Sequence, residues 1–171
     1  MEIELKLIDD TYVKNEYVEW LNDYEIVKYT EQRFEKHTIK KIKNYVKNVT
    51  ESKNEFLYGI FHHIKNQSKF IHIGNIKIGP IKPEHNSTEI GYIIGNKSYW
   101  GKGVMTESIR LATLICKNKY NLSKINAGVY ENNIGSIRAL EKNNFIEEGT
   151  LKSQVIFENK RINIKLFGKK I

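Results

Sequence analysis

A glycine-rich turn before a long amphipathic segment is the part of this sequence best suited to chemistry. Gly101 and Gly103 lie between a predicted strand, Glu89–Ile94, and a predicted helix, Val104–Lys119. A turn that opens a helix leaves several backbone N–H groups without partners, and the helix dipole adds partial positive charge there. Together with the charge of Lys102, these groups favour binding of an anion, most often a phosphate.

Two common glycine-loop chemistries fit this turn poorly. A dinucleotide-binding turn needs a third glycine, and Thr106 stands at that position. A nucleotide-binding P-loop needs Gly-Lys followed by Ser or Thr, whereas this chain has Gly101-Lys102-Gly103. On these residues alone, another kind of phosphate site and a glycine turn without a ligand both remain open.

The chain that must position this turn has the composition of a folded protein. Its 171 residues, with 40% apolar side chains, predict a single domain over residues 1–171. No apolar run approaches the roughly 20 residues that span a bilayer, and the first residues lack a signal-peptide pattern. Cys116 is the single cysteine, so no internal disulfide can form and a cytoplasmic location is expected. Cys116 lies on an apolar helix face and is predicted to be a core residue.

The charge of the chain bears on its partners. The formal net charge is +8, but the lysines are scattered and form no block. Such a surface suits a small anionic ligand and makes nucleic acid an unlikely partner. The histidines His62, His63, His72 and His85 have no metal-ligand spacing, so no metal is expected.

Alternating or continuous apolar segments predict the strands that would hold the turn in place. The predicted strands are Glu2–Ile8, Phe56–His63, Phe70–Ile78, Glu89–Ile94, Lys124–Val129, Thr150–Phe157 and Lys160–Phe167. The last two are joined at Glu158-Asn159, a hairpin turn. Lys65–Lys69 is predicted to be a polar turn, and Gly74 a bulge.

Apolar residues at helical spacing predict about four helices around this sheet. One includes Val13, Tyr17, Trp20 and Leu21 after a cap at Asp9 or Asp10, one spans Ile39 to Val49, one is Val104–Lys119, and one includes Ile134, Ile137 and Leu140. Tyr24–Phe34 has weak periodicity and is interpreted as a loop or short helix. The order of elements predicts an α/β (α+β) domain with a mixed, mostly antiparallel sheet of six to seven strands.

Several short motifs follow one another along the chain. They are Trp20-Leu21-Asn22-Asp23, Ile90-Gly91-Tyr92, Tyr99-Trp100-Gly101-Lys102-Gly103, Thr106-Glu107, Asn133-Ile134-Gly135-Ser136 and Leu140-Glu141-Lys142 with Phe145. With these motifs the chain resembles the GNAT superfamily of acyl-CoA-dependent N-acetyltransferases. It looks most like the branch that includes the ribosomal-protein N-terminal acetyltransferases.

The chain departs from the family pattern at three places. Trp100 takes the position where the superfamily usually has Gln or Arg, and Met105 is bulkier than the usual alanine or glycine. Asn143-Asn144 replaces a common x-Gly pair, and asparagine tolerates the left-handed conformation that such a position needs.

The resemblance implies a GNAT fold and acetyl-CoA as co-substrate. Backbone groups of Ile93 and Ile94 would bind the pantetheine arm. The N–H groups of Trp100, Gly101, Lys102, Gly103, Val104, Met105 and Thr106 would hold the pyrophosphate. Asn133 would reach the cofactor with help from Ser136, and its alternative role is an ordinary helix cap.

The implied chemistry is direct attack of an amine on a thioester. Glu89 is the first candidate for the base that takes the amine proton, directly or through water; the alternative is a solvated strand residue. Leu140 stands where many members have a tyrosine that protonates the thiolate, so Tyr130 and Tyr92 are substitutes that could equally be packing residues. Glu107 is expected to act as a dipole and capping partner.

The acceptor is the least determined part. The branch implies a small-molecule or peptide amine: a protein N-terminus, an amino sugar on a nucleotide, or a polyamine. Tyr29, Arg33 and Phe34 are the candidate acceptor-binding residues, with packing as the alternative. A non-catalytic module that binds CoA or nucleic acid is the alternative of another class, and the protein could be a monomer or a homodimer.

Overall fold

Seven strands form one sheet in the computed structural model, which describes residues 1–64 and 69–171. Their order in the sheet is β1-β2-β3-β4-β5-β7-β6. The strands are β1 (Glu2–Leu7), β2 (Phe56–Ile64), β3 (Lys69–Ile78), β4 (Ser87–Ile94), β5 (Lys124–Tyr130), β6 (Ile146–Phe157) and β7 (Lys160–Lys170). Every neighbouring pair is antiparallel except β4 and β5, which are parallel. The predicted mixed, mostly antiparallel sheet is therefore confirmed.

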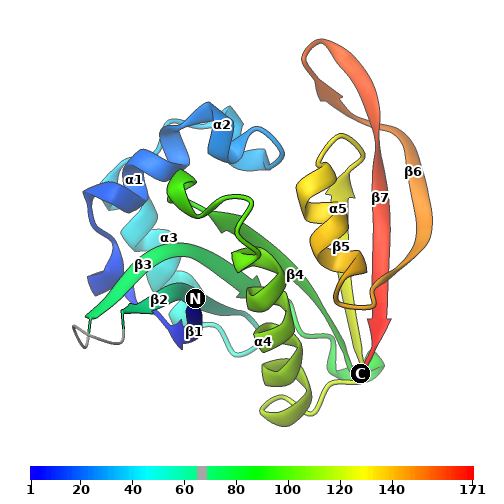
Figure 1. Cartoon of the computed structure of the whole chain (residues 1–171), viewed down its shortest axis with the longest axis horizontal. Coiled ribbons are helices and arrows are strands. Elements are labelled where there is room, and N and C mark those ends of the chain that lie inside the picture. Colours follow the sequence, from blue (N-terminus) through cyan, green and yellow to red (C-terminus); the bar gives the residue numbers. More distant parts are fainter. Residues whose placement is uncertain (65–68) are drawn as a thin grey trace.

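Helices cover both faces of this sheet (Figure 1). The described residues form five α-helices, which are α1 (Asn15–Asn22), α2 (Tyr24–Val27), α3 (Ile39–Glu51), α4 (Val104–Asn118) and α5 (Ile134–Glu141). One core lies between the sheet and α4, where Ile109 and Cys116 are 0% exposed. Burial of a side chain such as Ile109 contributes roughly 1.5–3 kcal/mol. A second core lies on the opposite face, under α1 and α3.

The start of the first helix differs from the sequence prediction. Asp9 does cap a helical turn, but that turn is a short 3₁₀ helix, Asp10–Tyr12. Lys14 is extended, and α1 begins only at Asn15. The segment Tyr24–Phe34 was predicted to be a loop or a short helix. It forms the short helix α2 and then a 3₁₀ turn, Glu31–Phe34.

Turn residues confirm other predictions. Asn144 adopts φ 60°, the left-handed conformation expected after α5. Glu158 and Asn159 both have positive φ, as a two-residue hairpin turn between twisted strands requires. The pairing of β2 with β3 shifts between Ile60 and Phe61, opposite Gly74, which confirms the bulge.

Two remaining expectations concern a loop and a lipid bilayer. The predicted polar turn Lys65–Lys69 falls mostly on residues 65–68, which lie outside the described residues. In the parts of the chain that are described, none of the helices has the length and hydropathy needed to cross a membrane.

Candidate active site

The sheet opens between β4 and β5. The two strands pair over only three positions, Ser87 to Glu89 with Lys124 to Asn126. Beyond these pairs β4 continues to Ile94 and β5 to Tyr130, and the strands diverge (Figure 1). Because a parallel pair needs continuous backbone contact, the divergence frees one edge of β4 next to its carboxyl end.

The alternation of backbone groups along β4 decides which residues face this opening. Gly79 donates to the carbonyl of Glu89, and Gly95 donates to the carbonyl of Ile73, each at 2.9 Å. The carbonyl of Ile93 lies against Gly74 of β3. Odd-numbered residues of β4 therefore bond to β3, and Tyr92 and Ile94 direct their backbone groups into the opening.

This geometry corrects part of the predicted pantetheine contact. The carbonyl of Ile93 faces β3 and is not directed at the opening. The carbonyl of Ile94 does face the opening, but it accepts a hydrogen bond of 2.9 Å from the indole N–H of Trp100. The backbone of Tyr92 and the N–H of Ile94 are the groups that remain on this edge.

The glycine turn leads directly from β4 into α4. Gly101 and Gly103 have φ of 71° and 77°, so both occupy the left-handed region in which glycine carries no steric cost. The first helical hydrogen bond of α4 runs from the N–H of Glu107 to the carbonyl of Gly103, at 3.0 Å. Within the described chain, the N–H groups of residues 101–106 have no protein acceptor. They form the cluster of free amides that the sequence predicts for an anion.

Trp100 has a different role from the one predicted. Its backbone N–H donates to the carbonyl of Lys97 at 3.0 Å, so it is not free for a phosphate. Its side chain instead joins the turn to the end of β4 through the bond to Ile94. The free amides begin one residue later, at Gly101.

The side chains at the start of α4 leave these amides accessible. Met105 is partly buried against the core, so its bulk is directed away from solvent. Glu107 forms two bonds with Arg110, at 2.7 and 2.8 Å, and this hydrogen-bonded arginine lowers the pKa of the carboxyl. The arginine offsets a charge that would otherwise repel an anion at the helix start. Lys102 is exposed and free to add positive charge.

The Trp20–Asp23 motif fixes the turn from the other side. The ring of Trp20 lies so close to Gly95 that no side chain would fit there. Asp23 forms an ion pair of 2.6 Å with Lys97, which lowers the pKa of Asp23. Asn22 both donates to and accepts from the backbone of His37 at 2.9 Å. These contacts hold α1 against the turn and against the entry to α3.

The start of α5 borders the opening on its far side. The Oδ1 atom of Asn133 accepts from the N–H of Ser136 at 3.2 Å, which is the helix cap considered above. Within the described residues the Nδ2 of Asn133 has no partner, so the cap leaves this amide nitrogen available. The hydroxyl of Ser136 lies 2.7 Å from that of Tyr92, so a hydrogen bond links α5 to β4. Burial raises the pKa of Tyr92 to about 12, which keeps its hydroxyl protonated.

The two catalytic candidates lie in different surroundings. Glu89 is exposed at the last paired position before the strands diverge, and its carboxylate lies 3.4 Å from Lys82. Tyr130 is buried at the end of β5, and its hydroxyl donates to Glu31 at 2.6 Å. Burial raises the pKa of Tyr130, and the bond to Glu31 adds to the effect. Any proton donation by Tyr130 would therefore require this bond to break.

The candidate acceptor residues have protein partners. Tyr29 stacks on Phe157 with ring centres 5.1 Å apart. Arg33 donates to the carbonyls of Lys28 and Ile156 at 2.6 and 2.9 Å. Phe34 is 66% exposed beside the guanidinium of Arg33. Tyr29 and Arg33 thus fasten the segment after α2 to the β6–β7 hairpin, as the packing alternative predicts.

A hollow of about 430 Å³ lies on the sheet face under α1 and α3. Gly91, Tyr92 and Ile93 of β4 form one wall, so the hollow adjoins the strand that borders the opening. Its other lining residues include Tyr17, Glu35, His37, Lys41, Tyr45, Asn75 and Lys77. We refer to it as the acceptor-side hollow. Sequence analysis did not identify Asn75, although a lone amide in the apolar strand Phe70–Ile78 is a usable signal.

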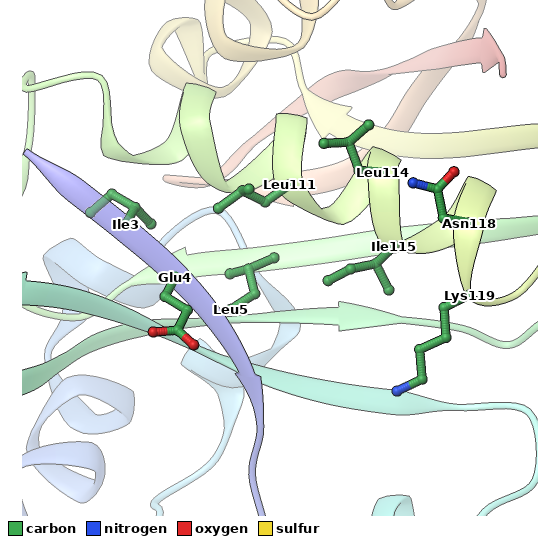
Figure 2. A pocket seen from close by; sticks show the side chains of 8 residues that line it. All are labelled: Ile3, Glu4, Leu5, Leu111, Leu114, Ile115, Asn118 and Lys119. Carbon is green, nitrogen blue, oxygen red and sulfur yellow. The ribbon is translucent and has the colours of Figure 1, made fainter.

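A second hollow of about 330 Å³ lies away from the opening, between β1 and α4 (Figure 2). Ile3 and Leu5 face Leu111, Leu114 and Ile115 across it. Its lining is mainly aliphatic, and Glu4, Asn118 and Lys119 are the polar residues among those that line it. Among the described residues there is also no cluster of His, Cys, Asp and Glu side chains that could hold a metal ion.

Known proteins resemble this chain in sequence and in fold. The probable N-acetyltransferase YjcK of Bacillus subtilis is 42% identical over 66 residues, which is 39% of this chain and 36% of that protein. The spermidine N-acetyltransferase of Vibrio cholerae, in complex with CoA and spermine, superposes with a TM-score of 0.84 at 20% identity, covering 98% of this chain and 95% of that one. The ribosomal-protein-S5-alanine acetyltransferase of Vibrio fischeri has a TM-score of 0.82 at 20% identity, covering 99% and 93%. At this identity the structural matches show the fold.

A sequence model of the acetyltransferase (GNAT) domain matches residues 5–146, which run from the second half of β1 to the start of β6 and include the whole glycine turn. Because this match spans most of the chain, the chain belongs to the GNAT acetyltransferase domain family.

Proposed function

We propose that this protein is an acetyl-CoA-dependent N-acetyltransferase that acetylates a primary amine, within the branch of the ribosomal-protein N-terminal acetyltransferases. The observation that carries the proposal is the cluster of free amides at residues 101–106, placed beside the diverging strands β4 and β5. The free amides suit the diphosphate of CoA, and the gap between the diverging strands leaves room for its pantetheine arm and thioester. The family match supports the same assignment.

The amides of residues 101–106 are proposed to hold the diphosphate of acetyl-CoA. A helix start combines unpaired N–H donors with the positive end of the dipole. Lys102 adds a full charge, and the pairing of Glu107 with Arg110 removes a competing one. Hydrogen bonds to charged oxygens contribute roughly 1.5–3 kcal/mol each, so a few of them account for tight binding of the co-substrate.

The edge of β4 is proposed to position the thioester. The backbone of Tyr92 and the N–H of Ile94 face the opening and can bond to the pantetheine arm as a neighbouring strand would. An N–H of the same edge can stabilise the oxygen that becomes negative during attack. Such fixed donors need no reorganisation when the charge develops.

Glu89 is proposed as the base. It lies on the same side of β4 as Gly91, which lines the acceptor-side hollow, so a water chain can connect the two. The amine nitrogen bonds to the thioester carbon, the C–S bond breaks, and the amine proton passes to Glu89 or to water. The thiolate takes its proton from solvent, because burial raises the pKa of Tyr92 to about 12 and makes this tyrosine a weaker acid than a thiol.

The acceptor is proposed to be the α-amino group of a polypeptide. The alternatives are an amino sugar and a polyamine. Of the two structural neighbours described above, one is named for a ribosomal protein and one for spermidine. A polyamine would favour unpaired carboxylates at its site. Glu35, the carboxylate that lines the acceptor-side hollow, is instead 3.5 Å from Lys41.

A thiol-release assay with purified protein and acetyl-CoA tests the function. The acceptors are peptides with free N-termini, amino-sugar nucleotides and polyamines, and calorimetry measures CoA binding in parallel. We expect micromolar binding of CoA and thiol release with one acceptor class. Absence of CoA binding would reject the assignment, whereas binding without thiol release would favour a CoA-binding module.

Asn133 supplies a prediction that separates catalysis from stability. Asn133→Ala should raise the Michaelis constant for acetyl-CoA several-fold and lower the free energy of unfolding by about 1 kcal/mol, because both the free Nδ2 and the cap are lost. Asn133→Ser keeps a capping oxygen but has no amide nitrogen. It should raise the Michaelis constant with little change in unfolding. If Asn133→Ser has the parent Michaelis constant, Asn133 is a cap alone.

A further inference from the structure

Asn75 of β3 is a buried polar side chain with an incomplete set of hydrogen bonds. It is 4% exposed, and its Oδ1 lies 2.9 Å from Nε2 of His72. Its Nδ2 has no hydrogen-bond partner, and no other buried side-chain nitrogen or oxygen in the described residues shares that condition. A buried donor left unpaired costs roughly 1–3 kcal/mol. A ligand that supplies an acceptor would remove this cost.

The ring of His72 lies beside this amide. Its ring is surrounded by Tyr12, Tyr17, Trp20 and Phe61, with ring centres 4.9 to 6.3 Å away. Burial lowers the pKa of His72, so the ring is neutral at pH 7 and carries one N–H. With that proton on Nε2, His72 donates to Oδ1 of Asn75. The two N–H bonds of Nδ2 are then left for another partner.

Asn75 lines the acceptor-side hollow, but its free Nδ2 exposes less than 1 Å², so a ligand reaches this nitrogen only when the wall of the hollow adjusts. Asn75 pairs across the sheet with Ile93, and Gly91 to Ile93 line the same hollow. Paired residues of this type have Cα atoms about 5.5 Å apart. The unpaired donor therefore lies within one strand spacing of the segment where the thioester is proposed to bind.

The two lysines of the hollow are both held in ion pairs. Lys41 and Lys77 line it, and each is paired, Lys41 with Glu35 at 3.5 Å and Lys77 with Glu55 at 2.6 Å. A polyamine carries only donors at neutral pH and would meet the N–H groups of Asn75. A carbonyl or hydroxyl oxygen of an acceptor substrate, by contrast, would accept a hydrogen bond from the N–H groups of Asn75.

We propose that the Nδ2 group of Asn75 binds an oxygen three bonds from the reacting nitrogen of the acceptor, and this inference rests on the acetyltransferase function above. The substrate then contains the unit N–C–C–O. The α-amino group of a peptide has it through its first carbonyl, and a 2-amino sugar has it through a hydroxyl. Polyamines and simple alkylamines lack it.

Asn75→Asp tests the inference, because it keeps the oxygen that faces His72 and replaces only the unpaired nitrogen. The rate constant kcat/KM is measured with alanyl-alanine amide, glucosamine and 1,3-diaminopropane. We expect the parent protein to prefer one of the first two acceptors over the diamine. Asn75→Asp should lower kcat/KM for that acceptor at least 10-fold and leave the diamine unchanged or improved. If the parent has the higher kcat/KM with the peptide, the bound oxygen is a carbonyl. If it has the higher kcat/KM with the sugar, the bound oxygen is a hydroxyl.

Two controls make the result decisive. Asn118→Asp makes the same charge change on exposed α4 and should leave the preference intact. Asn75→Ala removes the donor without adding bulk; it replaces Asn75→Asp if that variant does not bind CoA with parent affinity. Equal losses for all three acceptors, or a parent that prefers the diamine, would overturn the inference while leaving the enzyme assignment in place. No transfer by the parent to any amine would overturn both.

Discussion

Gly103→Val should raise the dissociation constant of CoA by about 100-fold, or ~2.7 kcal/mol. Gly103 has φ 77°, a conformation that a β-branched residue does not adopt without strain. A valine at this position forces the turn to rearrange, and the amides of residues 101–106 no longer converge on one anion. Loss of two charge-assisted hydrogen bonds is enough to produce this effect. Isothermal titration calorimetry measures it.

Two controls test whether the loss of CoA affinity in Gly103→Val depends on the diphosphate. Gly149→Val, in the edge strand β6, makes the same chemical change where φ is not positive and the nearest atom, in the side chain of Leu166, is 4.0 Å away. It should leave the CoA affinity within about twofold of the parent, as expected for a surface substitution. S-acetylpantetheine lacks the diphosphate, so its transfer rate should be equal in Gly103→Val and the parent. A parallel loss with both donors would mean that Gly103 acts through folding and not through phosphate binding.

Glu89→Gln should lower kcat/KM by about 100-fold at pH 7, at the lower end of the usual contribution of a general base. The amine is mostly protonated at this pH, and a base must take its proton before attack. At alkaline pH the free amine is already present, so the loss should shrink. The pH profile of thiol release by parent and variant measures this difference.

Glu84→Gln is the matched control for Glu89→Gln. Glu84 is an exposed carboxylate in the loop before β4 and lies outside the opening. Its replacement should leave both the rate and the pH profile unchanged. A pH-independent loss in Glu89→Gln would remove Glu89 from proton transfer and leave it as a solvated partner of Lys82.

Much of the fold could be predicted because local patterns determine it. Alternation located β1 and β3 to within a few residues, and helical spacing located α4 to its last turn. The start of α1 could not be predicted, because a cap such as Asp9 signals a helical turn without giving its length. The early start of β6 at Ile146 was also missed, since register shifts interrupt its pairing with β7.

The candidate site could be predicted only where its residues are neighbours in the sequence. The glycines and the free amides follow from one short stretch of chain, so the turn was found. The partners of Tyr130 and Arg33 lie 99 and 123 residues away in the sequence, and no local pattern indicates them. The assignment of Ile93 failed because strand alternation alone does not say which residues face β3. Asn75 was missed because its significance depends on His72 and on the hollow.

Titration of ¹⁵N-labelled protein with CoA, followed by amide NMR shifts, tests the central claim most directly. The free amides of residues 101–106 should show the largest shifts and should saturate with a single affinity. The amides of Tyr92 and Ile94 should follow, and that of Trp100, which already donates to Lys97, should move less. Saturable binding that leaves the amides of residues 101–106 unperturbed would contradict the account.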